Sequence, residues 1–123
     1  MIDKKKIISI LFDDLITKIK DIEDIKLVTI HTSGENELRE LFFILDLLDY
    51  KWYGGNKILF DDFMFKYCIE EVREKQDLYI SLNYREKKRI TRTANKQFLI
   101  DNNFNFFSFK ELKKSSWKII KEN

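Results

Sequence analysis

The hydrophobic positions near the start of the chain predict a helix and then a strand. In residues 3–20 the apolar side chains recur every three or four positions, which is the spacing of a helix with one buried stripe; they are Ile8, Leu11, Phe12, Leu15 and Ile19. Residues 26–32 (KLVTIHT) are rich in β-branched side chains and lie between two polar segments. Such a segment is typical of a strand.

The next predicted helix, residues 35–50, is the most apolar part of the chain. Thr32 or Ser33 is expected to cap it. It carries two apolar stripes, one of Leu38, Leu41, Phe42, Leu45 and Leu48 and one of Phe43, Ile44 and Leu47. One sheet cannot cover both stripes, so either another helix or another subunit must cover the second one. A symmetric dimer is the commonest such assembly, so we expect a homo-oligomer.

The rest of the chain predicts a turn, a third helix, a hairpin, a strand and a last helix. Residues 50–57 contain two glycines and are expected to form the turn. Asp61 or Asp62 would cap a helix over residues 61–76, and the side chains expected in its buried stripe are Phe65, Cys68, Ile69 and Val72.

The hairpin joins a half-buried strand, residues 77–84, to a second strand, residues 88–93, through the turn REKK. A further strand around Phe104 and Phe106 leads to Ser108, which opens a capping box and a helix through Lys121. This order predicts an α+β fold in which one small sheet with an antiparallel hairpin is covered by helices. Its 123 residues are expected to form a single domain, 1–123.

Composition and charge narrow the function classes. Hydrophobic residues make up 44% of the chain and the net charge is only +2, so the chain is expected to fold and nucleic acid is an unlikely partner. Cys68 is the only cysteine and His31 the only histidine, so we expect no disulfide, no metal and no cofactor. The early apolar run is broken by Asp13 and Asp14, so we expect neither an export signal nor a membrane span. The predicted location is therefore cytoplasmic.

The motifs give little sign of catalysis. A nucleophile needs a base beside it, yet His31 lies at the end of a predicted strand. Each of the acidic pairs, at residues 13–14 and 61–62, consists of sequence neighbours whose side chains diverge on a helix. The segment YGGN lacks the spacing and the Lys-Ser/Thr of a phosphate-binding loop. We therefore expect a protein that is not an enzyme.

The segment SLNYREKKRITRTANK, residues 81–96, is the best candidate for a binding site. Five cations and one glutamate within residues 85–92 give it a local charge of +4. Arginine forks onto phosphates and stacks on bases, so an arginine and threonine strand beside aromatic rings suits a phosphorylated nucleotide. The candidate ligand-binding residues are Arg85, Arg89, Thr91, Arg92, Asn95, Trp52 and Tyr53. The alternative is a solvated hairpin edge beside a packed aromatic corner.

Two segments carry a resemblance to a known family: ELRELFFILDLLDYKWYGG, a helix that runs into an aromatic and glycine turn, and NFNFFSFKEL near the end. With the size and element order, they resemble the phage anti-Thoeris family over residues 26–113. Members of that family are small sponges that sequester a cyclic ADP-ribose signal made by bacterial TIR-domain enzymes.

The resemblance implies a homo-oligomer that binds a cyclic nucleotide through arginine and aromatic side chains without cleaving it, in the host cytoplasm if a phage encodes it. Two other functions stay open. One is an inhibitor that docks on a host defence complex, as anti-CRISPR proteins do. The other is a small nucleic-acid-binding protein that uses the basic hairpin.

Overall fold

The computed structural model describes residues 13–58, 63–75, 77–84 and 86–112, and its centre is one five-stranded sheet. The strands are β1 (Val28–Ser33), β2 (Lys51–Trp52), β3 (Asp77–Leu82), β4 (Arg89–Thr93) and β5 (Asn105–Ser108). Their order across the sheet is β2-β4-β3-β1-β5. β3 pairs antiparallel with both β1 and β4. At the two edges, β5 pairs parallel with β1, and β2 pairs parallel with β4. The predicted α+β fold with one sheet and an antiparallel hairpin is confirmed, although the sheet is mixed.

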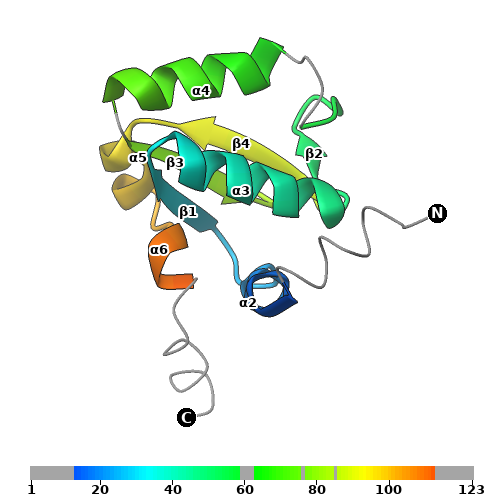
Figure 1. Ribbon diagram of the computed structural model, residues 1–123. Helices are drawn as coiled ribbons and strands as arrows, with labels where there is room; N and C mark the ends of the chain where they lie inside the picture. Colours follow the sequence, from blue (N-terminus) through cyan, green and yellow to red (C-terminus); the bar gives the residue numbers. More distant parts are fainter. Residues whose placement is uncertain (1–12, 59–62, 76, 85, 113–123) are drawn as a thin grey trace, which may run out of the picture.

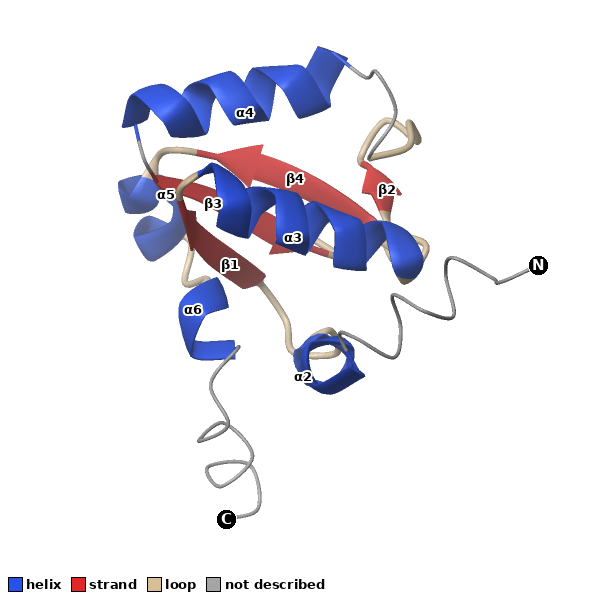
Figure 2. Ribbon diagram, in the orientation of Figure 1, coloured by secondary structure: helices blue, strands red, loops and turns tan. Residues whose placement is uncertain are grey.

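The described helices lie on both sides of this sheet (Figures 1 and 2). They are α2 (Asp13–Ile22), α3 (Glu35–Leu47), α4 (Phe63–Lys75), α5 (Lys96–Asp101) and α6 (Phe109–Leu112). α3 and α4 cross one face together, and α5 lies behind the sheet as Figure 1 shows it. None of the helices in the described ranges is long and apolar enough to cross a membrane.

The main core lies between the sheet and the pair α3 and α4. Alternate strand residues such as Ile30, Ile80 and Ile90 point into it and are fully buried. α3 contributes Leu38, Leu41, Phe42, Ile44 and Leu45, all with no exposed surface. This face therefore holds most of the apolar surface that drives folding.

A smaller core lies on the opposite face, where α5 packs. Leu99 of α5 meets Tyr79 of β3 and Phe104, and Tyr84 packs against this cluster. Tyr79 and Ser81 are only 7% and 2% exposed. The prediction that residues 77–84 form a half-buried strand was therefore wrong, because β3 is a central strand with both faces covered.

The second apolar stripe of α3 is largely covered within the chain. Ile44 is fully buried in the main core and Leu47 packs against it, while Phe43 is 38% exposed. The sequence pattern allowed either another helix or another subunit to cover this stripe. Elements of the same chain supply most of that cover. The apolar stripe thus gives the homo-oligomer little support.

Several predicted boundaries differ from the structure. Gly34, with φ of 105°, precedes α3 in place of a side-chain cap, since Thr32 is buried in β1 and donates to the Leu78 carbonyl at 3.1 Å. The predicted turn contains the short edge strand β2, and α5 was not predicted at all.

Other predictions fall partly outside the described residues. These are the start of the first helix, the caps Asp61 and Asp62, and the continuation of the last helix to Lys121. Within the described ranges, Leu15, Ile19, Cys68, Ile69 and Val72 are buried as their spacing predicted, and Phe65 is half-buried.

Candidate ligand-binding site

Hydroxyl side chains gather on the face of the sheet opposite α3 and α4. Successive side chains of a strand point to opposite faces, so the neighbours of the core residues Ile80 and Ile90 point away from the core. They are Ser81 on β3 and Thr91 on β4, and the next residue of this row on β4 is Thr93. We call this side of the sheet the hydroxyl face.

A cavity of about 420 Å³ lies on the hydroxyl face beside α5. This volume is within the range of small-molecule sites, about 300–1,000 Å³. The residues that line the cavity are Tyr53, Tyr84, Thr91, Arg92, Thr93, Asn95, Phe98 and Phe104. They come from β4, α5 and the segments that follow β2, β3, β4 and α5, so the cavity exists only in the folded chain.

Aromatic rings form one wall of this cavity. The ring of Phe104 lies 5.1 Å from that of Tyr84 and 6.4 Å from that of Phe98, measured between centroids. Tyr53 is 48% exposed and Phe98 is 42% exposed, so both leave apolar surface open to a ligand. Rings of this kind suit a flat aromatic ligand, because offset or edge-on contacts between rings add to the burial of apolar area.

Tyr84 reaches this wall because the strand alternation is interrupted before it. Simple alternation places Tyr84 on the side of Leu82, in the main core. Asn83, however, has a φ of 55°, the left-handed conformation that asparagine tolerates better than most residues. The chain therefore turns at Asn83, and Tyr84 packs on the opposite cluster.

Threonine and asparagine side chains supply the polar groups of the cavity. Asn95 caps α5, since its Oδ1 accepts a hydrogen bond from the Phe98 N–H at 3.0 Å. The Asn95 N–H in turn donates to Thr93 Oγ1 at 3.0 Å. These bonds fix the ends of β4 and α5. The Thr91 hydroxyl and the side-chain Nδ2 of Asn95 make no hydrogen bond within the described residues, so they are available to a ligand.

Arg92 is held on the other side of the sheet. Its guanidinium is paired with Glu71 of α4, with Nε 3.0 Å from Oε1, and it lies 4.8 Å from the centroid of the Tyr67 ring. Arg92 is among the residues that line the cavity, between Thr91 and Thr93, but its guanidinium lies on the opposite face, where Glu71 neutralises its charge.

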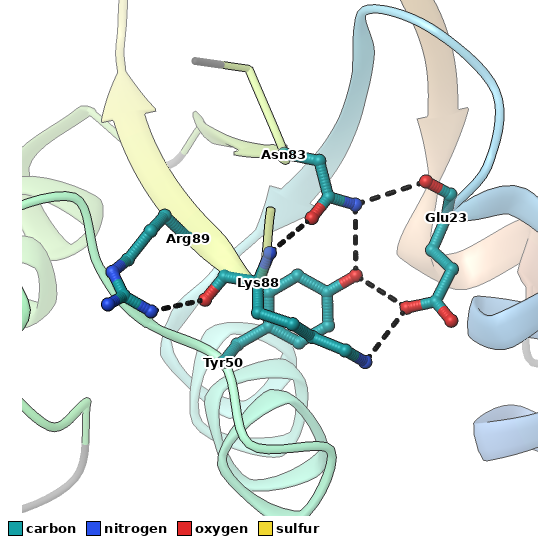
Figure 3. A network of polar contacts seen from close by, with 5 residues as sticks. All are labelled: Glu23, Tyr50, Asn83, Lys88 and Arg89. Atoms are coloured by element: carbon teal, nitrogen blue, oxygen red, sulfur yellow. Dashed lines mark hydrogen bonds and ion pairs between the residues drawn. The ribbon is translucent and has the colours of Figure 1, made fainter. Parts of the chain in front are cut away.

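Lys88, another cation of the basic hairpin, belongs to a network that joins three segments (Figure 3). Its ammonium pairs with Glu23 at 3.1 Å and lies 4.6 Å from the centroid of the Tyr50 ring. Tyr50 donates to Glu23 at 2.7 Å, and Asn83 donates to the Tyr50 oxygen at 3.2 Å. Burial and the Glu23 carboxylate raise the pKa of Tyr50 well above its ordinary value. Lys88 thus stabilises the hairpin.

The remaining candidates lie in three different environments. Trp52 is 4% exposed and packs edge-on against Phe42 at 5.5 Å, so its ring belongs to the main core. Arg89 is half-buried at the start of β4 and donates to the Lys88 carbonyl at 3.3 Å. Arg85 lies outside the described residues. The cavity therefore unites Tyr53, Thr91, Arg92 and Asn95 of the predicted set.

A second recess, of about 500 Å³, lies beyond α5 on the same face and contains His31. His31 Nε2 is 2.6 Å from Asp77 Oδ1, and its ring centroid is 5.0 Å from that of Tyr79. Because Asp77 lies opposite Ser33, two residues along β1 from His31, this contact is a diagonal cross-strand hydrogen bond. Such a bond orients His31 and stabilises the central strands.

The candidate set from the sequence lacked four lining residues, Tyr84, Thr93, Phe98 and Phe104. The Asn-Lys-Gln-Phe segment after β4 contains an asparagine cap that could have revealed α5 and hence Phe98. No family model, curated protein or solved structure matches this chain. Its function must therefore be inferred from the cavity and its surroundings.

Proposed function

We propose that this protein binds a nucleotide in the cavity on the hydroxyl face and sequesters it without cleaving it. The observation that carries the proposal is the lining itself: exposed rings of Tyr53 and Phe98 beside the hydroxyl of Thr91 and the side-chain amide of Asn95. A nucleobase combines a flat apolar face with a polar edge. Rings can stack on its face while the hydroxyl and the amide bind its edge.

The cavity favours a base or a sugar over a phosphate. Its lining residues other than Arg92 carry no formal charge, and the charge of Arg92 is neutralised by Glu71. A phosphate needs cations or several N–H donors for compensation. We therefore assign the base and ribose to the cavity and keep any phosphate outside it.

The resemblance to the anti-Thoeris family makes a cyclic ADP-ribose the first ligand to test. The purified protein is incubated with this nucleotide, passed through a filter that retains the protein, and then heated. We expect depletion of free ligand from the filtrate and full recovery of unchanged ligand after denaturation. A cleaved product would show that the protein is an enzyme, and an undepleted filtrate would exclude sequestration of this ligand.

Two variants connect that assay to the cavity. Tyr53→Ala removes an exposed ring from the rim, while Tyr67→Ala removes a ring of similar exposure, 43%, from α4. We expect the first to abolish or greatly weaken depletion and the second to leave it unchanged. Equal depletion by both variants would place the ligand elsewhere.

The two alternative functions predict different results. A docking inhibitor of a host defence complex would deplete no nucleotide. A nucleic-acid-binding protein would bind DNA with an affinity that falls steeply with salt, because its phosphate contacts release counterions. The pairing of Lys88 and Arg92 with carboxylates leaves fewer hairpin cations for that role. A homo-oligomer stays part of the proposal, and light scattering tests it against the 15.0 kDa monomer.

A further inference from the structure

Two cations lie next to each other on the hydroxyl face, beside the cavity. Lys51 and Arg89 are direct partners in the parallel pairing of β2 and β4, and the next partners along the strands are Trp52 and Ile90. Trp52 and Ile90 are both in the main core. Because side chains alternate between faces, Lys51 and Arg89 point to the hydroxyl face. We call Lys51 and Arg89 the cation pair.

The cation pair has no acidic partner within the described residues. Two other cations of the hairpin do have acidic partners: Lys88 pairs with Glu23, and Arg92 pairs with Glu71. Arg89 donates one N–H to the Lys88 carbonyl, and a guanidinium has five such donors. In Figure 3 its side chain extends away from Tyr50 and Glu23. Like charges directly opposite on a sheet are destabilising, and an anion between them removes that repulsion.

The position of the cation pair relative to the cavity fits a nucleotide. Arg89 is two residues before Thr91 on the same face of β4, a separation of about 7 Å at 3.3 Å per residue. Tyr53 likewise follows Lys51 by two residues, and its N–H bonds to the Ile90 carbonyl, which continues the pairing. A ribose spans a comparable distance between its base and its 5′-phosphate.

We propose that the cation pair binds the phosphate of a ligand whose base and ribose occupy the cavity. This inference rests on the proposed function. It adds Lys51 to the binding residues and gives the orientation of the ligand, whose phosphate lies toward β2. Arg89 supplies a planar fork for two phosphate oxygens, and Lys51 supplies a point charge. The ligand class is therefore a nucleotide with a phosphate on its ribose, including cyclic forms that keep such a phosphate.

Calorimetry on the whole chain with matched ligands tests this division. One pair of probes is adenosine and adenosine 5′-monophosphate, and the other is guanosine and guanosine 5′-monophosphate. The two pairs test both purine bases. For the wild type we expect each monophosphate to bind about ten- to a hundredfold more tightly than its nucleoside. In Lys51→Ala and Arg89→Ala that preference should fall by about tenfold or more, with nucleoside affinity unchanged. Arg89→Lys should restore only part of it.

Lys87→Ala is the matched control, because Lys87 is an exposed cation in the same hairpin. It should keep the full preference for the monophosphate, and unfolding midpoints should show that all variants fold. If both cation-pair variants keep the preference, the inference is wrong while the proposed function stands. If the wild type binds nucleosides and monophosphates equally, the inference is also wrong. If it binds none of the probes, the proposed function and this inference both fail for purine ligands.

Discussion

The two faces of the sheet use their side chains for different purposes. On the side of α3 and α4, apolar residues fill the core and the charged residues at its border are paired, as Arg92 is with Glu71. On the hydroxyl face, α5 covers only part of the sheet. Among the described residues, the Thr91 hydroxyl has no hydrogen-bond partner and the two cations of the cation pair have no acidic partner. Satisfied groups stabilise a fold, whereas available groups can bind a ligand.

The same strand contributes to both faces. In β4, Ile90 and Arg92 serve the main core and the contact with α4, while Arg89, Thr91 and Thr93 face the other way. Period-two alternation thus lets five residues hold the hairpin in place and present a binding surface. Substitutions at neighbouring positions should therefore affect stability and ligand binding separately.

The largest expected effect is the loss of a core ring. Phe42 is fully buried between α3 and the sheet, with Trp52 at 5.5 Å and Phe65 at 5.8 Å. Phe42→Ala should lower the free energy of unfolding by about 3–5 kcal/mol, because it removes buried surface and leaves a cavity. Urea unfolding followed by circular dichroism measures this change.

The matched control for Phe42 is Phe98 on the hydroxyl face, which is 42% exposed. Phe98→Ala should change the free energy of unfolding by less than about 1 kcal/mol. If Phe42→Ala does not fold, Phe42→Leu provides a milder test in the same direction. Equal losses at the two positions would contradict the difference between the faces.

The next largest effect concerns the network around Tyr50. Tyr50→Phe removes the hydroxyl between Glu23 and Asn83, leaving part-buried polar groups with one partner fewer. We expect a loss of about 1–2 kcal/mol in the free energy of unfolding and unchanged ligand affinity. Lower ligand affinity at unchanged stability would instead assign this network to the binding site.

Alkaline pH provides an independent test of the same network. The pKa of Tyr50 is raised in the folded chain from an ordinary value of 10.0. Above about pH 10 the unfolded chain loses this proton and the folded chain keeps it, so stability falls as the pH rises. The fall should be smaller in Tyr50→Phe than in the wild type.

A smaller effect is expected from Thr91 on the hydroxyl face. Thr91→Val removes a hydroxyl that has no partner within the described residues and keeps the β-branched shape. The free energy of unfolding should change by no more than about 0.5 kcal/mol. Ligand affinity should fall about two- to tenfold, as expected for one neutral hydrogen bond. Calorimetry and urea unfolding of the same preparation separate the two quantities, and unchanged affinity would place the ligand away from Thr91.

The fold was largely predictable because it depends on periodic patterns. The stripes of residues 35–50 and 61–76 and the hairpin at residues 77–93 correspond to α3, α4, β3 and β4. The short elements were missed: β2 has two residues, and α5 has six. Such segments are too short to show a period, and tertiary pairing determines their structure.

The candidate site was predictable only in part, because sequence shows charge but not pairing. Arg92 and Lys88 look alike as surface cations, yet each pairs with a carboxylate 21 or 65 residues away. Trp52 looked available for stacking, and its partner Phe42 lies in another element. Tyr53 and Thr91, both named from the sequence, line the cavity, whereas Phe104 reaches it only through a contact between distant segments.

The smallest expected effect lies at the outer surface of the helix pair. Glu35 of α3 accepts hydrogen bonds from Arg73 of α4 at 2.6 Å and from Arg39 at 2.7 Å. These arginines lower the pKa of Glu35 from 4.5 to about 2. The folded chain therefore binds this proton only at lower pH than the unfolded chain does. The resulting stabilisation should be complete above about pH 4.5, decline as the pH falls to about 2, and be absent below that.

Glu35→Gln should thus be less stable than the wild type at neutral pH by a small margin, since the contact is exposed and salt-screened. Urea unfolding at pH 7, 4 and 2.5 should show the margin shrinking, and a constant margin would mean that hydrogen bonding other than the ionised carboxylate joins α3 to α4.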